Sequence, residues 1–170
     1  MRRRLLSLPL VAFGLVITWA CGPTPDLTTI KLVPTMTGYY DNGPMPSTGE
    51  NHLLPSVTFQ LKNEGTLPLT NVDLVLAFWP NGADGEKDSK QIRAIKDQPL
   101  EPGATGEPIT VRSDVGFRSL YPRAEFFGRP EFVDFTIRVF AQRNGRTVKL
   151  GEVPVERRLI PAARRDGSRP

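Results

Sequence analysis

Residues 56–62 (SVTFQLK) carry the clearest structural signal in this chain of 170 residues. The apolar residues Val57, Phe59 and Leu61 alternate with polar residues, so they share one face of an extended strand. Residues 63–66 (NEGT) follow at once, and asparagine and glycine adopt turn conformations more readily than other residues. We therefore expect a strand that is buried on one face and ends in a turn.

Similar patterns occur on both sides of this stretch. Strands are predicted for residues 27–33, 71–79, 91–95, 108–112, 132–142 and 147–155. Residues 71–79 are apolar on both faces for part of their length, which predicts a central strand that is covered on both sides. Residues 91–95 predict a short edge strand. The chain thus alternates strands with turns, and no stretch predicts a long amphipathic helix.

The best-defined pair of strands is joined by residues 143–146 (RNGR). An Asn-Gly pair is the strongest short-range signal for a hairpin because both turn positions need a positive φ. In the first strand of this pair, alternate residues from Val133 to Ala141 are expected to share one face. In the second strand, Gly151 predicts a bulge and Pro154 predicts an edge position, since proline cannot donate a hydrogen bond to a neighbouring strand.

Three segments between the strands predict loops. Residues 34–55 are rich in glycine, proline, serine and asparagine and predict a long loop with room for a short hairpin. Residues 80–89 predict a polar loop, and residues 113–131 predict a second long segment with room for a helical turn. Together these patterns predict an all-β fold. We expect a single immunoglobulin-like antiparallel β-sandwich of about seven strands over residues 27–160.

Two turn motifs carry a resemblance to known families. Residues 57–66 (VTFQLKNEGT) place Lys-Asn-x-Gly at the end of a strand, and residues 100–103 (LEPG) place Leu-x-Pro-Gly before a later strand. Over residues 56–111 this pattern resembles bacterial immunoglobulin-like domains of the CARDB and FxLYD kind. The resemblance implies a module for adhesion, spacing or accessory roles that lacks an active site.

The N-terminus has the parts of a secretory signal: a charged head at residues 1–4 (MRRR), an apolar run to residue 20 and a small residue before a cysteine. The run is shorter than the ~20 residues that span a bilayer, which favours a signal-peptide helix over a transmembrane helix. Ala20-Cys21 resembles the lipobox of bacterial lipoproteins. The resemblance implies a signal peptide at residues 1–20, cleavage between Ala20 and Cys21, and acylation of Cys21. The alternative is a plain secretory signal cut after Ala20.

The lone cysteine favours acylation, because an unpaired thiol is a liability in an oxidising compartment. Residues 21–26 then form a tether, and residues 161–170 predict a disordered basic tail. We expect the mature protein to be anchored to a bacterial membrane by its N-terminal lipid and to face the periplasm or the exterior. Removal of the three head arginines reduces 22 basic residues to 19, against 18 acidic ones, which argues against a nucleic-acid partner.

Residues that usually carry chemistry are scarce. His52 is the only histidine and is expected to be a solvated loop residue, and with Cys21 it supplies too few ligands for zinc. The spacing of Asp84, Glu86 and Asp88 is similar to that of calcium loops, but no bidentate glutamate follows at the required distance. We therefore expect no enzyme, no cofactor and no metal site.

An aromatic segment at residues 117–129 is the remaining candidate binding patch. Tyr121, Phe126 and Phe127 occur there with Arg123, and such a mixture is typical of protein-binding surfaces. We favour the interpretation that these aromatic residues fold back and plug one end of the sandwich. The expected function is a binding, structural or accessory module of the cell envelope with a protein partner. The alternative is a small-ligand or carbohydrate-binding module that uses this segment.

Overall fold

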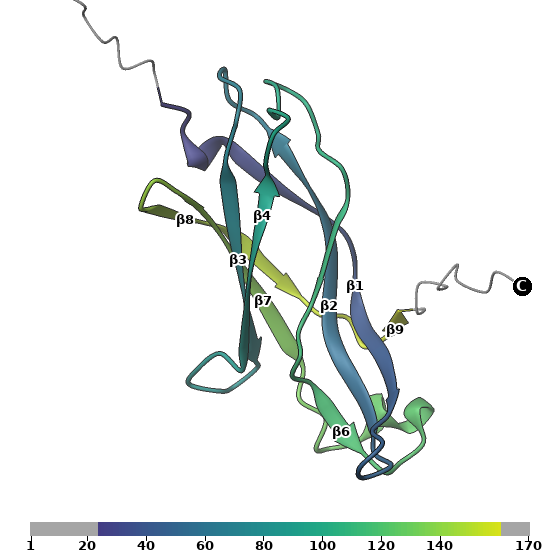
Figure 1. Cartoon of the computed structure of the whole chain (residues 1–170). Helices are drawn as coiled ribbons and strands as arrows, with labels where there is room; N and C mark the ends of the chain where they lie inside the picture. The colour runs from purple at the N-terminus through teal and green to yellow at the C-terminus, as the bar shows by residue number, and fades with distance from the viewer. Residues whose placement is uncertain (1–23, 161–170) are drawn as a thin grey trace, which may run out of the picture.

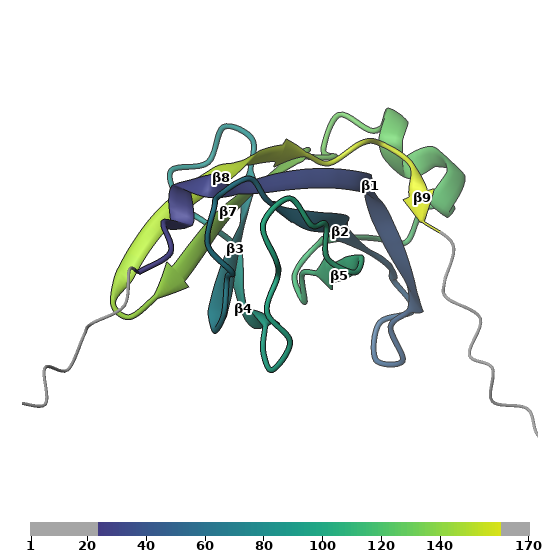
Figure 2. The same cartoon turned by 90° about the horizontal axis from the view of Figure 1, so that it is seen from above.

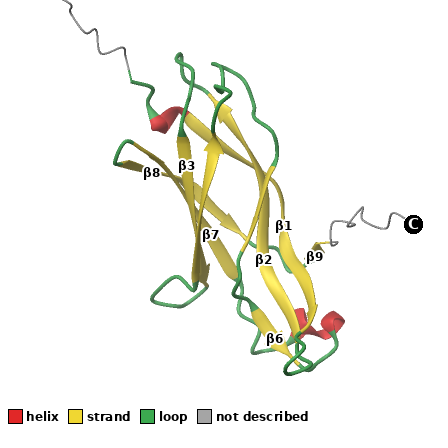
Figure 3. Ribbon diagram, viewed as in Figure 1, coloured by secondary structure: helices red, strands yellow, loops and turns green. Residues whose placement is uncertain are grey.

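The structure is a computed structural model that describes residues 24–160 as two β-sheets packed face to face (Figures 1 and 3). The strands are β1 Ile30–Pro44, β2 Asn51–Asn63, β3 Val72–Pro80, β4 Asp88–Ile95, β5 Ile109–Arg112, β6 Phe117–Ser119, β7 Phe135–Arg143, β8 Arg146–Pro154 and β9 Leu159–Ile160. Two short 3-10 helices, η1 Leu27–Thr29 and η2 Arg123–Gly128, complete the described elements. The predicted all-β sandwich is confirmed.

The strand order matches an immunoglobulin-like layout. One sheet has the order β5-β2-β1-β9, with β6 also paired to β2, and the other has the order β4-β3-β7-β8. Thus the first two strands share a sheet with the fifth, while in the opposite sheet the third strand pairs with the fourth and the seventh, and the seventh pairs with the eighth. Seen from above in Figure 2, β1 runs beside β8 on one side of the sandwich, and β4 and β5 lie on the other side.

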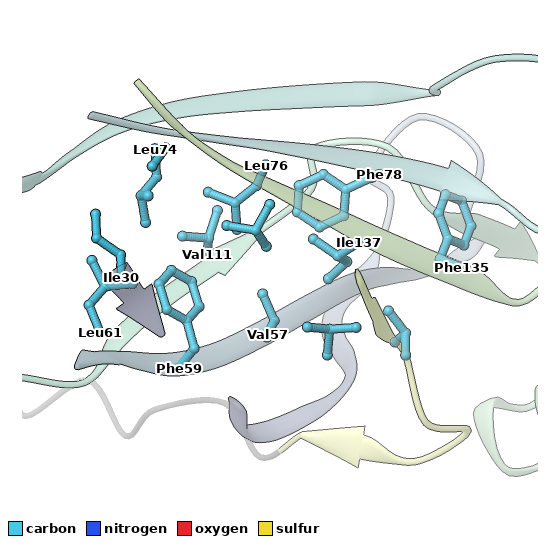
Figure 4. Close-up of a cluster of buried hydrophobic side chains, with 14 of the residues drawn as sticks. Ile30, Val57, Phe59, Leu61, Leu74, Leu76, Phe78, Val111, Phe135 and Ile137 are labelled. Atoms are coloured by element: carbon cyan, nitrogen blue, oxygen red, sulfur yellow. The ribbon is translucent and has the colours of Figure 1, made fainter. Parts of the chain in front are cut away.

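The core is formed by the inner faces of the two sheets (Figure 4). On β2, the alternating residues Val57, Phe59 and Leu61 are at most 2% exposed, as their spacing predicts. They meet Leu74, Leu76 and Phe78 of β3 and Ile137 of β7 across the sandwich. Full burial of one such side chain contributes about 1.5–3 kcal/mol, so each residue of this layer stabilises the fold substantially.

The prediction of a long loop at residues 34–55 is wrong. β1 extends to Pro44 and β2 begins at Asn51, so these residues form two paired strands with a tight connection. The ladder between them shifts register after Pro34 and again after Asp41. Such bulges interrupt the period of two by which a strand is recognised in a sequence, and this explains why the segment resembles a loop.

The hairpin of β7 and β8 is confirmed. Asn144 has a φ of 48° and Gly145 a φ of 77°, as the predicted turn requires. Val139 pairs with Gly151 and Phe140 pairs with Lys149, so Leu150 is the extra residue of a bulge, one position before the predicted Gly151. One detail is wrong: the strand starts at Phe135 rather than residue 132, and Val133 is 42% exposed instead of facing the core.

Candidate functional site

The predicted aromatic segment closes one end of the sandwich, next to η2 (Figure 1). Phe126 is fully buried, and its ring lies 5.2 Å from that of Phe117 on β6. Phe127 is half-buried and packs against Tyr39 of β1 and Phe132, with ring centroids 5.6 and 5.2 Å apart. Phe126 and Phe127 therefore plug this end, as favoured from the sequence, whereas Tyr121 does not.

Tyr39 lies in the middle of this plug and is fully buried. The sequence predicts a loop at this position, whereas the structure places Tyr39 on β1. Burial, assisted by the negative charge of Asp134, raises the pKa of its hydroxyl far above the ordinary value. The hydroxyl thus stays neutral and acts as part of the packing rather than as an acid or base.

Two of the predicted patch residues remain at the surface. Tyr121 is 47% exposed, and the guanidinium carbon of Arg129 lies 3.3 Å from its ring centre. Arg123 is held by Asp41, with Nη1 and Oδ2 2.7 Å apart, and its Nε donates to Asn51. The side-chain amide of Asn51 in turn donates to the Tyr121 carbonyl at 2.9 Å. These contacts fix the loop that presents Tyr121.

Leu120 is an exposed neighbour of Tyr121 that the sequence reasoning did not single out. It is 75% exposed, the highest value among the large apolar residues exposed in the described chain. The sequence signal for an exposed apolar residue here is a leucine between a serine and a tyrosine in a predicted loop. Leu120 and Tyr121 together form an apolar spot at the plugged end, and we call them the tip pair.

His52 was expected in a solvated loop, and this prediction is wrong. The residue lies on β2 opposite Arg118 of β6 and is 5% exposed. Burial, together with the positive charge of Arg118, lowers the pKa of the imidazole. The error has the same origin as the one at residues 34–55, because the start of β2 was hidden in the apparent loop.

Asp88 joins the two sheets at the β4–β5 side of the sandwich. Its carboxylate accepts hydrogen bonds from Ser113 Oγ at 2.7 Å and from the backbone N–H groups of Asp114 and Ser89. Partial burial by itself would raise the pKa of the carboxyl, but these hydrogen bonds and the charge of Lys90 outweigh it and lower the pKa. Asp84 and Glu86, the other members of the predicted acidic spacing, are exposed in the preceding loop.

We predict that Asp88→Ala lowers the free energy of unfolding by about 1–3 kcal/mol at neutral pH, because the buried Ser113 hydroxyl loses its acceptor. Because folding lowers the pKa of Asp88, its ionised carboxylate stabilises the folded protein at pH values above ~3.9, the pKa in the unfolded chain. This stabilisation is lost as the pH falls through the lower pKa of the folded state. The difference between parent and variant should therefore shrink below about pH 4. Urea titrations between pH 7 and pH 3 measure it, with Asp84→Ala as the exposed control. If Asp88→Ala lowered the free energy of unfolding equally at pH 7 and pH 3, the ionised carboxylate of Asp88 would not be the stabilising group.

Two concave regions lie away from the aromatic plug. A groove of about 640 Å³ runs between the end of β4 and residues 104–109, with Leu61, Leu100 and Ile109 among its apolar residues and charges of both signs at its rim. A smaller hollow of about 360 Å³ lies on the outer face of the β1–β2–β5 sheet. Neither was predicted, because each collects residues from several segments that are distant in the sequence.

Within residues 24–160, the structure has no helix long and apolar enough to cross a membrane. The same residues contain no group of three or more His, Cys, Asp or Glu side chains that could hold a metal ion. The predicted signal peptide, the acylation site Cys21 and the basic tail lie outside the described residues.

The fold defines the chain as a β-sandwich protein with an immunoglobulin-like strand order. No protein-family model matches the chain, and a search of curated proteins finds no match.

Proposed function

We propose that this chain is a lipid-anchored module of a bacterial cell envelope that works by binding a partner protein, and that it is not an enzyme. The observation that carries the proposal is the sole cysteine, Cys21, placed after a charged head, an apolar run and Ala20. Two or three acyl chains on this residue would anchor the protein stably, since each buried methylene contributes ~0.8 kcal/mol.

The arrangement of the sandwich supports this proposal. η1 and the aromatic plug lie at opposite ends of the molecule (Figure 1). Residues 22–26 can span at most about 18 Å when extended, so a lipid on Cys21 would hold the η1 end close to the membrane. The tip pair, Leu120 and Tyr121, would then point away from the membrane, where a partner could reach it.

The anchor predicts a clear labelling result. In bacteria grown with an alkyne-bearing palmitate, the parent protein should take up the label and sediment with membranes. Cys21→Ser should lose the label completely, because no other residue of the chain offers a thiol. Thr24→Ser, three residues later, is the control and should keep it. Label that persists in Cys21→Ser, or a parent protein without label, would contradict the proposal.

The carbohydrate-binding alternative rests on Tyr121. Sugars stack on exposed aromatic faces, and Tyr121 is the most exposed aromatic residue of segment 117–129. The guanidinium of Arg129 already covers part of this ring at 3.3 Å. This contact reduces the surface left for a sugar and favours the protein-binding proposal.

A further inference from the structure

The hollow on the outer face of the β1–β2–β5 sheet is lined by residues of four strands, and Ser56 of β2 is one of them. Gly38 of β1 lies opposite Ser56 of β2 in the ladder. Gly38 itself is covered by Arg158 and Ile160, since a Cβ atom at this position would lie within 3.0 Å of both residues. The hollow has a volume of about 360 Å³. The surrounding side chains are Met36 and Tyr40 of β1, Thr58 of β2, Thr110 and Arg112 of β5 and Ile160 of β9.

Most of the wall of this hollow is apolar. Met36 is 36% exposed, whereas Ile160 is 9% exposed and pairs with Tyr40 across β1 and β9. The polar atoms are hydroxyl groups from the neighbouring strands. Thr58 and Thr110 share one hydrogen bond of 2.9 Å, which uses only one of their two hydroxyl protons and leaves the other to donate. The hollow thus offers an apolar wall and a few hydrogen-bonding groups, as small-molecule sites do.

One positive charge stands at the rim of the hollow. The guanidinium carbon of Arg112 lies 4.3 Å from the centre of the Tyr40 ring. Among residues 24–160, Arg112 makes no ion pair, and the same is true of Arg118 on the adjoining β6. Both side chains are exposed. This part of the sheet therefore carries two positive charges that form no direct ion pair within the described residues.

We infer that the hollow binds a small amphiphile with one negatively charged head group. The head accepts hydrogen bonds from the guanidinium of Arg112, whose planar fork matches the oxygens of a carboxylate or a phosphate. The apolar part lies against Met36, Tyr40 and Ile160. A volume of about 360 Å³ is within the range of sites for small molecules. The hollow shares no residue with the tip pair and does not depend on acylation of Cys21.

Methionine methyl groups provide a direct test. Met36 and Met45 are the methionines of the described chain, and only Met36 lines the hollow. The full chain, labelled with ¹³C at its methionine methyl groups, is placed in phosphatidylcholine nanodiscs and titrated with octanoate and, separately, with octyl phosphate. The Met36 resonance, assigned with Met36→Leu, should shift and saturate while that of Met45 stays in place. The tighter of the two ligands identifies the head group.

Charge variants complete the test. Arg112→Gln should weaken binding about fivefold, the usual size of one exposed charge pair, and Arg112→Lys should restore part of it. Arg118→Gln, the matched control outside the hollow, should bind like the parent. Octyltrimethylammonium should bind at least about fivefold more weakly than octanoate. The inference is overturned if Met36 shifts no more than Met45, or if the shift is the same in Arg112→Gln or with the cationic ligand.

Discussion

Gly116→Ala is expected to lower the free energy of unfolding by more than about 3 kcal/mol, beyond the usual cost of overpacking. A Cβ atom at Gly116 would lie 1.9 Å from the carbonyl oxygen of Leu53 and 3.0 Å from the Cα of Leu54. Both are backbone atoms of β2, the strand that pairs with β1, β5 and β6. They cannot rotate away as the end of a side chain would. The clash must therefore displace either β6 or β2.

Urea denaturation of the purified variants measures this loss. Gly85→Ala is the matched control, because a Cβ at that position has no heavy atom within 4 Å and, as at Gly116, the φ is not positive. The control should be neutral or slightly stabilised, since alanine reduces the conformational freedom of the unfolded chain. A loss in Gly116→Ala within about 1 kcal/mol of the control would contradict the close approach to β2.

Gly116 also illustrates what the sequence could and could not predict. The regular strands were recognisable because Val57, Phe59 and Leu61 alternate strictly, and because the Asn-Gly hairpin signal depends on adjacent residues. Gly116 was one glycine of an apparent loop. Its constraint comes from Leu53, more than sixty residues earlier, and becomes visible only when β6 is placed against β2.

The sequence also predicts the Lys-Asn-x-Gly turn and the Leu-x-Pro-Gly turn separately, but it does not predict the contact between them. The Asn63 side chain is fully buried, and its amide donates to the carbonyl groups of Leu67 and Leu100. The Gly103 N–H donates to the Asn63 carbonyl at 2.7 Å. Asn63 thus holds the turn after β2 against the Leu-x-Pro-Gly turn. Each motif has a local signal, but the contact between them joins segments that are almost forty residues apart.

The candidate sites show still more clearly the difference between features with a local sequence signal and features that depend on long-range contacts. The aromatic segment could be found because its members are close in sequence, and its role as a plug follows from their size. The hollow required four strands to be placed beside one another before Arg112, Tyr40 and Ile160 could be seen as one surface. Register within a sheet is a long-range property, and the bulges of β1 hide it further.

Phe126→Ala is the second substitution expected to have a large effect, with a loss of about 3–5 kcal/mol in the free energy of unfolding. The side chain is fully buried, and its ring makes an edge contact with Phe117 at 5.2 Å. Truncation removes the transfer free energy of the ring and leaves a cavity beneath η2. Since natural domains are stable by only about 5–15 kcal/mol, this loss would remove a large part of the total.

The aromatic plug should loosen before the rest of the sandwich in this variant. Amide hydrogen exchange is expected to quicken in β6 and η2, which contact the core mainly through aromatic rings, and to change less in β3 and β7. Tyr121→Ala is the matched aromatic control, and its 47% exposed ring should cost less than about 1 kcal/mol. If the two variants lost equal stability, Phe126 would not be the anchor of the plug. The same two variants are useful for tests of partner binding. Only Tyr121→Ala would remove a contact of the tip pair while leaving the end of the sandwich closed.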